Sequence, residues 1–336
     1  MQLLKSLIVF LSATCFNWFS VPLLAQTAGG QAIFSFLRLP TGAQQSSVGG
    51  ETTSLISRDL GIIHQNPALL RPFHHSQLSL SFTPMPAGIQ QYYLAAAVYK
   101  EKIATAFAAQ VQYIGYGSIM QTDPSGNELG NFNPRDYQVQ LTASRRYLDK
   151  WHYGGSLQFI QSNYGAYRSS GMAITLGMNY FDSTRQFQAG LVMKHMGIQL
   201  RNFVPGQTEN LPFELQAGIT KRLARAPLQF SVTLRDLHRL ILYKPDSTIS
   251  SADQIFQHVV LGAQAFIGDK IELGVGYNHL RRRELSIANT SNGLTGFSLG
   301  AGILINRFQF RYARSFYTNV KGYHQVSMNY DLGIMN

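Results

Sequence analysis

The stretch that decides the fold is residues 211–236, which read LPFELQAGITKRLARAPLQFSVTLRD. Apolar and polar residues alternate through its first half, and they alternate again after a tight connection at residues 224–227. A period of two residues is typical of a β-strand with one apolar face and one polar face. The stretch therefore predicts a hairpin of two strands, each long enough to cross a bilayer when tilted.

Composition decides whether the apolar faces of such strands contact a protein core or lipid. Only 13% of the 336 residues are Asp, Glu, Lys or Arg, compared with roughly 25% in an ordinary soluble domain. Beyond residue 25 the sequence contains no apolar run of the ~20 residues that a membrane helix requires. A chain that is poor in charge, rich in Tyr and Phe and without such runs is typical of an all-β fold, a transmembrane antiparallel β-barrel.

Residues 1–25 predict a secretory signal peptide. Lys5 precedes an apolar run at residues 7–24, and Ala25 supplies a small residue for cleavage. The alternative is a membrane anchor, which polar and helix-breaking interruptions of the run disfavour. The sole cysteine, Cys15, lies in this segment, so the mature chain is expected to contain no thiol, disulfide or cysteine-bound metal.

Residues 26–75 do not alternate and are expected to form a separate segment ahead of the barrel. A short helix is expected around residues 52–60, and the candidate hatch motif Asn66, Pro67 and Ala68 follows it. Such a mixed segment is either a plug in the barrel lumen or a periplasmic tail.

Residues 76–336 are expected to form the transmembrane β-barrel. Outer-membrane barrels alternate short periplasmic turns with longer outer loops, and the predicted connections alternate in this way. The longest outer loops, 120–134, 244–256 and 284–293, are the candidates for partner contact by length. The fourteen predicted strands are 76–82, 91–99, 103–119, 135–147, 152–164, 169–181, 186–200, 211–223, 228–243, 257–267, 270–283, 294–304, 308–317 and 323–332.

The polar faces of these strands distinguish a barrel from a sandwich. In the strand at 135–147, Val139 and Leu141 alternate with Gln138, Gln140 and Thr142. A face of Gln, Thr and Ser side chains cannot form the dry centre of a sandwich, whereas it can line a wet or plugged lumen. The sequence therefore favours a closed barrel with its polar residues turned inward.

The chain shows no convincing catalytic, cofactor-binding or metal site. Residues 296–300 match the spacing of a hydrolase nucleophile elbow, but no helix follows, so Ser298 is expected to be a lumen residue. His74 and His75 are adjacent on an extended chain and point to opposite sides, which disfavours a shared metal. Gly274 and Gly276 lie within a strand, where glycine more often marks a bend than a ligand site. A non-enzymatic protein without a cofactor is expected.

Positive charge is the remaining candidate for binding. The formal net charge is +11, which favours contact with outer-membrane lipid and lipopolysaccharide; the alternative is a set of solvated turns and lumen residues. The densest run, Arg281, Arg282 and Arg283, is predicted at the outer end of a strand. It is a candidate contact for lipopolysaccharide phosphates or an acidic protein surface, or else the solvated base of a loop. Nucleic acid is not an expected partner, because a signal peptide would direct the chain out of the cytoplasm.

Several stretches resemble known families. The opening FSFLRLPTGA at residues 34–43, the pair Gly49 and Gly50, and NPALL at residues 66–70 resemble the N-terminal pattern of FadL-like outer-membrane barrels. Together with LPFELQAG at 211–218 and LARAPL at 223–228, they more closely resemble the PorQ family of type IX secretion proteins, over nearly the whole mature chain.

This resemblance implies a non-enzymatic component of the attachment complex in the outer membrane of a Gram-negative envelope. In that family the barrel works beside PorV, PorU and PorZ, which process secreted cargo and anchor it to surface lipopolysaccharide. The expected role is a platform that holds PorZ at the surface. The alternative is a FadL-type transporter that passes a hydrophobic ligand through the barrel.

Overall fold

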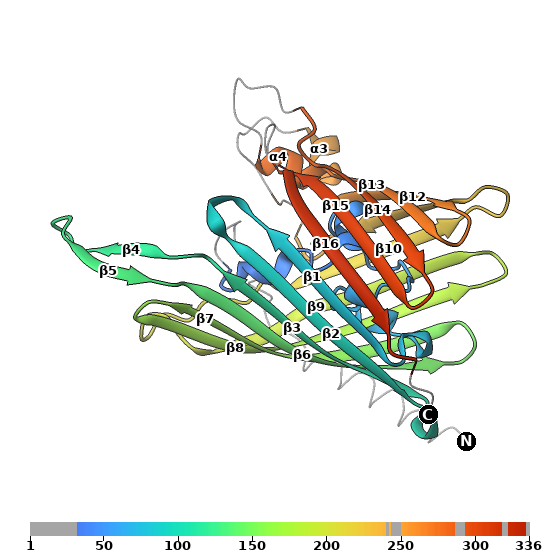
Figure 1. Ribbon diagram of the computed structural model, residues 1–336, viewed down its shortest axis with the longest axis horizontal. Helices are drawn as coiled ribbons and strands as arrows, with labels where there is room; N and C mark the ends of the chain where they lie inside the picture. Colours follow the sequence, from blue (N-terminus) through green and yellow to red (C-terminus); the bar gives the residue numbers. More distant parts are fainter. Residues whose placement is uncertain (1–31, 240–241, 243–249, 286–292, 318–321, 334–336) are drawn as a thin grey trace, which may run out of the picture.

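The computed structural model describes residues 32–239, 242, 250–285, 293–317 and 322–333 of the chain. The predicted signal peptide with Cys15 lies outside the described residues. Fourteen strands form a closed antiparallel barrel in which chain neighbours are also sheet neighbours (Figure 1). The barrel strands are β1 (Gln77–Pro84), β2 (Gln90–Lys100), β3 (Thr105–Gly115), β6 (Arg135–Tyr147), β7 (Trp151–Tyr164), β8 (Tyr167–Asp182), β9 (Phe187–Arg201), β10 (Glu214–Arg222), β11 (Leu228–Leu234), β12 (Val259–Ile267), β13 (Ile271–Asn278), β14 (Phe297–Ile305), β15 (Phe308–Phe316) and β16 (Gly322–Asp331).

The first and last strands close the barrel. Gln77 of β1 lies opposite Asp331 of β16, and Phe82 lies opposite Val326. The predicted all-β antiparallel barrel of fourteen strands is therefore confirmed. No helix within the described ranges is both long and apolar enough to cross a membrane.

The largest differences from the sequence prediction lie at two strand ends and in one loop. The strand predicted at 228–243 ends at Leu234, and Asp236 takes a positive φ of 48° that interrupts extended structure. The strand predicted at 270–283 ends at Asn278, whose side chain caps helix α4 (His279–Glu284). The loop predicted at 120–134 contains a hairpin of β4 (Ile119–Thr122) and β5 (Glu128–Phe132) outside the barrel sheet.

The barrel wall is apolar outside and polar inside. On β6, Val139 and Leu141 are exposed, whereas Gln140 and Thr142 are buried. The inward residues bond to one another across the strands, for example Thr142 Oγ1 to Ser156 Oγ at 2.8 Å. This arrangement is the reverse of a soluble fold and matches the inward polar face that alternation predicted.

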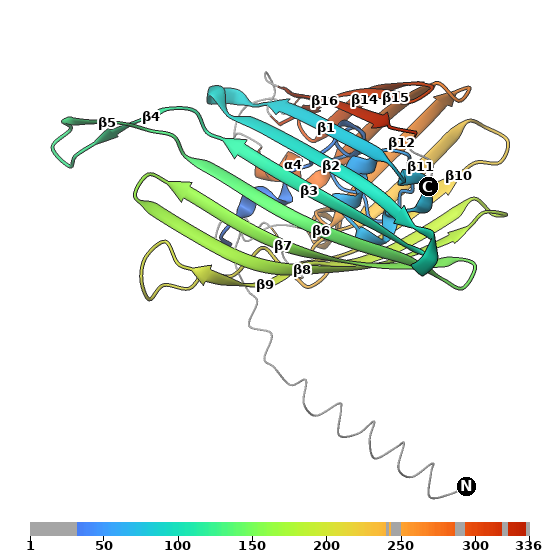
Figure 2. The ribbon, with the colours of Figure 1, turned by 60° about the horizontal axis from the view of Figure 1, so that its bottom comes forward.

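Residues 32–75, called the lumen segment below, lie inside the barrel (Figures 1 and 2). The helix expected around 52–60 is wrong, because residues 52–59 form no helix and Thr53 and Ser54 lie in a bend. Their hydroxyls bond to Gln216 and Thr220 of β10. The helices of the segment are η1 (Ser35–Arg38), α2 (Ala43–Ser47), η2 (Leu60–His64), η3 (Pro67–Leu69) and η4 (Pro72–His74).

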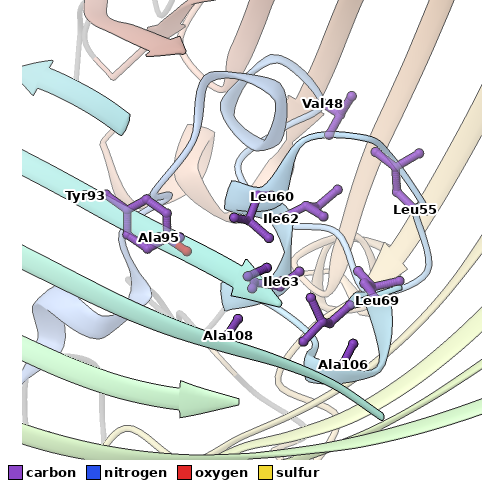
Figure 3. Packing of buried hydrophobic residues seen from close by; sticks show 12 residues of the cluster. Val48, Leu55, Leu60, Ile62, Ile63, Leu69, Tyr93, Ala95, Ala106 and Ala108 are labelled. Atoms are coloured by element: carbon purple, nitrogen blue, oxygen red, sulfur yellow. The ribbon is translucent and has the colours of Figure 1, made fainter. Parts of the chain in front are cut away.

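Apolar contacts hold the lumen segment against part of the wall (Figure 3). Leu60, Ile63 and Leu69 pack in one buried cluster with Tyr93 of β2 and Ala106 of β3. Burying such an aliphatic side chain contributes about 1.5–3 kcal/mol. The small alanines on β2 and β3 leave room for these side chains, so the segment has a core of its own within a polar lumen. A second cluster joins Phe34, Phe36 and Leu37 to Ile114, Ile160, Ala173 and Leu211 of the wall region.

Candidate functional site

The predicted motif Asn66, Pro67 and Ala68 lies against the barrel wall at two glycines. A Cβ added at Gly177 of β8 would lie 1.9 Å from Asn66 Oδ1, and one added at Gly154 of β7 would lie 2.6 Å from the carbonyl carbon of Pro67. Asn66 Oδ1 accepts from the Ala68 backbone N–H at 3.0 Å, while Asn66 Nδ2 donates to the Met178 carbonyl at 3.4 Å. The motif therefore caps η3 and fixes it to β8.

Inward glycines receive the lumen segment at further points around the barrel. A Cβ at Gly276 of β13 would lie 2.0 Å from the backbone nitrogen of Gly49, and one at Gly190 of β9 would lie 2.3 Å from the Thr53 carbonyl oxygen. Real Cβ atoms essentially never approach backbone so closely. The wall thus has recesses that match the path of the segment on opposing arcs of the sheet.

A buried ionic cluster joins the lumen segment to β9, β10 and the end of β11. Arg235 Nη1 lies 2.5 Å from Glu51 Oε1 and Arg235 Nη2 lies 3.7 Å from Glu214 Oε1, while Lys194 Nζ lies 2.9 Å from Glu214 Oε2. Asp236 completes the cluster, 3.0 Å from Arg235 Nε. Burial raises the pKa of Glu51 to about 7 against the lowering effect of Arg235. Every charge in the cluster has an opposite partner, as buried charges require.

A second buried cluster lies nearer β13 to β16. Asp59 of the lumen segment accepts from Asn329 Nδ2 at 2.9 Å and lies 3.9 Å from Arg311 Nη1. Arg311 Nε also donates to Glu272. The lumen segment is therefore tied by charge to both the β9–β11 side and the β13–β16 side of the barrel.

His74 is a neutral, fully buried link within the lumen segment. Its Nδ1 accepts from the Arg71 backbone N–H at 3.1 Å, so Nε2, 3.0 Å from the Ser57 carbonyl, carries the proton. Burial lowers the pKa of His74 to about 4, although the Ser57 carbonyl and Asp59 favour the charged form. A second proton would have to displace the Arg71 N–H from Nδ1.

Acidification is expected to loosen the lumen segment through His74. An undocked histidine takes up a proton below about pH 6.5, whereas docked His74 does so only near pH 4, so stability present above pH 6.5 is lost as the pH falls. From pH 7 to 5 this costs about 2 kcal/mol of docking free energy. Hydrogen exchange of residues 32–75 at pH 7 and pH 5 measures this change in docking free energy. His74→Gln is expected to remove about that much of the pH dependence; an unchanged dependence would contradict the assignment.

A cavity of about 460 Å³ lies between the lumen segment and β10 to β15 at the short-turn end of the barrel. Leu55, Ile56 and Phe266 contribute apolar surface to its lining. Arg222 stacks over the Phe266 ring at 4.5 Å. Because charged groups share the walls, a wholly apolar ligand would remove the water that solvates them. The charged residues in the lining are Arg58, Arg222, Arg311, Asp269 and Glu272.

The arginine run lies on α4 and not at a strand end. Arg281 is buried, donates to the Gly49 carbonyl at 3.2 Å and lies over the Tyr317 ring at 4.4 Å. Arg283 forms an ion pair with Asp253 at 2.9 Å, and Arg282 is half-buried on the same helix. The guanidinium groups of Arg281 and Arg283 thus bind within the chain, and Arg281 fixes α4 to the lumen segment.

The other candidate sites considered from the sequence are a serine nucleophile and a metal site. Ser298 is fully buried in the lumen and accepts from the Gly49 backbone N–H at 3.1 Å, which confirms its expected position. Within the described residues no cluster of three His, Cys, Asp or Glu side chains is arranged to hold a metal.

The ionic clusters and the wall recesses were not identified from the sequence. Alternation does place Glu214 on the polar face of its strand, and Gly276 stands out as a glycine inside a strand. Both signals are local, whereas the partner of each, Glu51 and Gly49 respectively, belongs to a distant segment without a periodic pattern. The contacts therefore became visible only in three dimensions.

Among known proteins, solved structures are similar to this chain in fold. No family model matches the sequence, and no curated protein matches it. The solved structure of the TodX deltaS2S3 mutant monoaromatic hydrocarbon channel is similar with a TM-score of 0.50 and 12% identity, covering 86% of this chain and 96% of that one. The CymD monoaromatic hydrocarbon channel has a TM-score of 0.51 and 13% identity, covering 89% and 99%. A Pseudomonas aeruginosa FadL homologue has a TM-score of 0.47 and 11% identity, covering 87% and 98%. At 12–13% identity, the similarity to TodX and CymD shows a shared barrel fold.

Proposed function

We propose that this chain is an outer-membrane platform of the type IX secretion attachment complex. It would hold PorZ- and PorU-type partners, beside a PorV-like protein, while secreted cargo is processed and anchored to surface lipopolysaccharide. The resemblance to the PorQ family motivates this assignment. A barrel of this fold belongs in the outer membrane of a Gram-negative envelope.

The observation that carries the proposal is the tight seating of the lumen segment. Asn66 and Gly49 meet wall glycines at distances that leave no space for a Cβ, and Glu51 forms a buried ion pair with Arg235. A lumen occupied by a segment so fixed gives a rigid body suited to holding partners. The motif that carries part of the family resemblance, at residues 66–70, is also part of this seating.

The test is a deletion of the gene combined with recovery of the complex. Deletion is expected to leave cargo unanchored in the medium while uptake of hydrophobic compounds is unchanged. The detergent-solubilised barrel is expected to recover PorZ or PorU. Anchored cargo in the deletion strain, or a barrel that recovers neither protein, would contradict the platform function.

A second candidate is transport of a hydrophobic ligand. The fold shared with two monoaromatic hydrocarbon channels favours it, and the 460 Å³ cavity would be the binding site for the ligand on its passage. The charged lining of the cavity, which includes Arg222 and Glu272, argues against an apolar ligand there. Loss of uptake with cargo still anchored, or a purified barrel that carries only lipid, would favour transport.

A further inference from the structure

The hairpin of β4 and β5 stands apart from the rest of the molecule. Its two strands pair only with each other in the described structure, and they project well beyond the barrel wall (Figures 1 and 2). All four residues of β4 are exposed, and so is β5 up to the half-buried Phe132. Both outer edges of the hairpin thus lack a neighbouring strand among the described residues.

The hairpin is preorganised at its tip. Asp123 Oδ1 accepts from the backbone N–H groups of Ser125 at 2.9 Å and Asn127 at 2.8 Å, and Asp123 Oδ2 accepts from Asn127 Nδ2 at 2.9 Å. These bonds fix the turn, as Asp and Asn side chains commonly do. An isolated two-stranded hairpin has marginal stability in water, so a third strand would stabilise it. The ordered tip holds the two strands in place to receive that strand.

The edge of β4 is the better template for another strand. Gly130 in β5 has a φ of 115°, which departs from extended geometry, whereas no residue of β4 has a positive φ. Ile119 and Met120 on β4 are 44% and 54% exposed, and Leu129 on β5 is 60% exposed. Unpaired backbone groups beside apolar side chains are the conditions under which proteins add a strand.

The charge of the hairpin indicates the kind of strand that fits. Residues 117–133 contain Asp123 and Glu128 and no Lys, Arg or His, in a chain with a net charge of +11. The carboxylate of Asp123 is used within the tip, whereas Glu128 has no partner within the described structure. Lysine or arginine on a strand added to β4 would meet this negative charge, with Asp123 directly after β4 and Glu128 opposite Thr122 across the hairpin.

We propose that the β4–β5 hairpin is the docking arm of the platform, and that a partner protein adds a lysine- or arginine-bearing edge strand to β4. The inference rests on the proposed function, because it names the surface through which the platform holds its partner. It requires a partner outside the membrane, on the side from which the hairpin projects.

Three variants test the arm in the full-length barrel. Replacing residues 117–133 with Asn-Gly is expected to reduce recovery of the partner at least tenfold, while the barrel keeps its heat-modifiable migration in gels. Glu128→Lys is expected to weaken binding about threefold and to reduce its salt dependence. Val204→Ser is the matched control in another connection, where Val204 is 43% exposed, and is expected to leave binding unchanged.

A photocrosslinker attached at position 121 of β4 identifies the partner segment that contacts this strand. Beyond residue 25 the chain contains no other cysteine, so Gln121→Cys carries a thiol-linked photocrosslinker at one site. The crosslinked partner peptide is expected to be a basic edge strand; a helix or loop would overturn strand addition. If the complex survives loss of the hairpin, docking through the hairpin is wrong and the platform function still stands. If the wild-type barrel recovers no partner, both the platform function and docking through the hairpin are wrong.

Discussion

Gly276→Ala is expected to displace the lumen segment from β13 and to open the barrel to ions. The added Cβ would lie 2.0 Å from the Gly49 backbone nitrogen and 2.3 Å from the Val48 carbonyl carbon. Overpacking a core typically costs about 1–3 kcal/mol, and a clash with backbone in two places puts this variant at about 3 kcal/mol. Ser298 and Arg281 also hold the Gly49 backbone by hydrogen bonds, so the segment cannot easily move aside. The docked population is expected to fall about 100-fold relative to the undocked one.

Two measurements check this result. Single-channel conductance in a planar bilayer is expected to rise, and protease is expected to cut within residues 32–75 of the folded barrel. Gly155→Ala on β7 is the matched control, because its Cβ would meet Leu176 Cδ2 at an ordinary 3.5 Å. A Gly276→Ala barrel with the conductance and protease resistance of the Gly155→Ala barrel would show that the recess does not hold the segment.

The barrel itself could be predicted from the sequence because its signal is local. Alternation of Val139 and Leu141 with Gln138 and Gln140 gives the strand, its lipid face and its lumen face without knowledge of any partner. The alternation of short and long connections then gives the number of strands. Each step needs only neighbouring residues.

The contacts inside the barrel could not be predicted in this way. Gly276 was expected to mark a bend, whereas the structure shows a close approach of the Gly49 backbone, which depends on how a distant, non-periodic segment is folded. Glu51 likewise gives no sign in sequence that Arg235 is its partner.

The arginine run shows an error that local chemistry could have avoided. A strand was predicted through Arg283, but Asn278 accepts from the Arg281 backbone N–H at 3.0 Å and begins a helix. Asn is among the residues most favoured at such a position. The helix then turns Arg281 inward toward Gly49, so charge density alone was a poor guide to exposure.

Arg235→Met is expected to be the most destabilising single substitution of a charged residue in the lumen. It leaves Glu51, Glu214 and Asp236 without the guanidinium that contacts all three. Breaking a buried ion pair by removing one partner costs about 3–5 kcal/mol, because the remaining charge stays desolvated. Arg283→Met is the matched control, because the side chain of Arg283, which pairs with Asp253, is 41% exposed. An ion pair at such a site contributes at most about 1 kcal/mol.

The pH dependence of the unfolding free energy lost in Arg235→Met distinguishes lost charge balance from lost packing. Without the arginine, Glu51, whose pKa already lies near 7 because of burial, takes up a proton more readily. A carboxyl group with a raised pKa destabilises the folded state only once it is ionised, so the deficit is expected to be larger at pH 8 than at pH 5. Urea unfolding of the detergent-folded barrel at both pH values measures it. Adding Glu51→Gln to Arg235→Met is expected to recover part of the loss at pH 8 and little at pH 5, whereas a deficit independent of pH and of Glu51 would mean that Arg235 acts through packing alone.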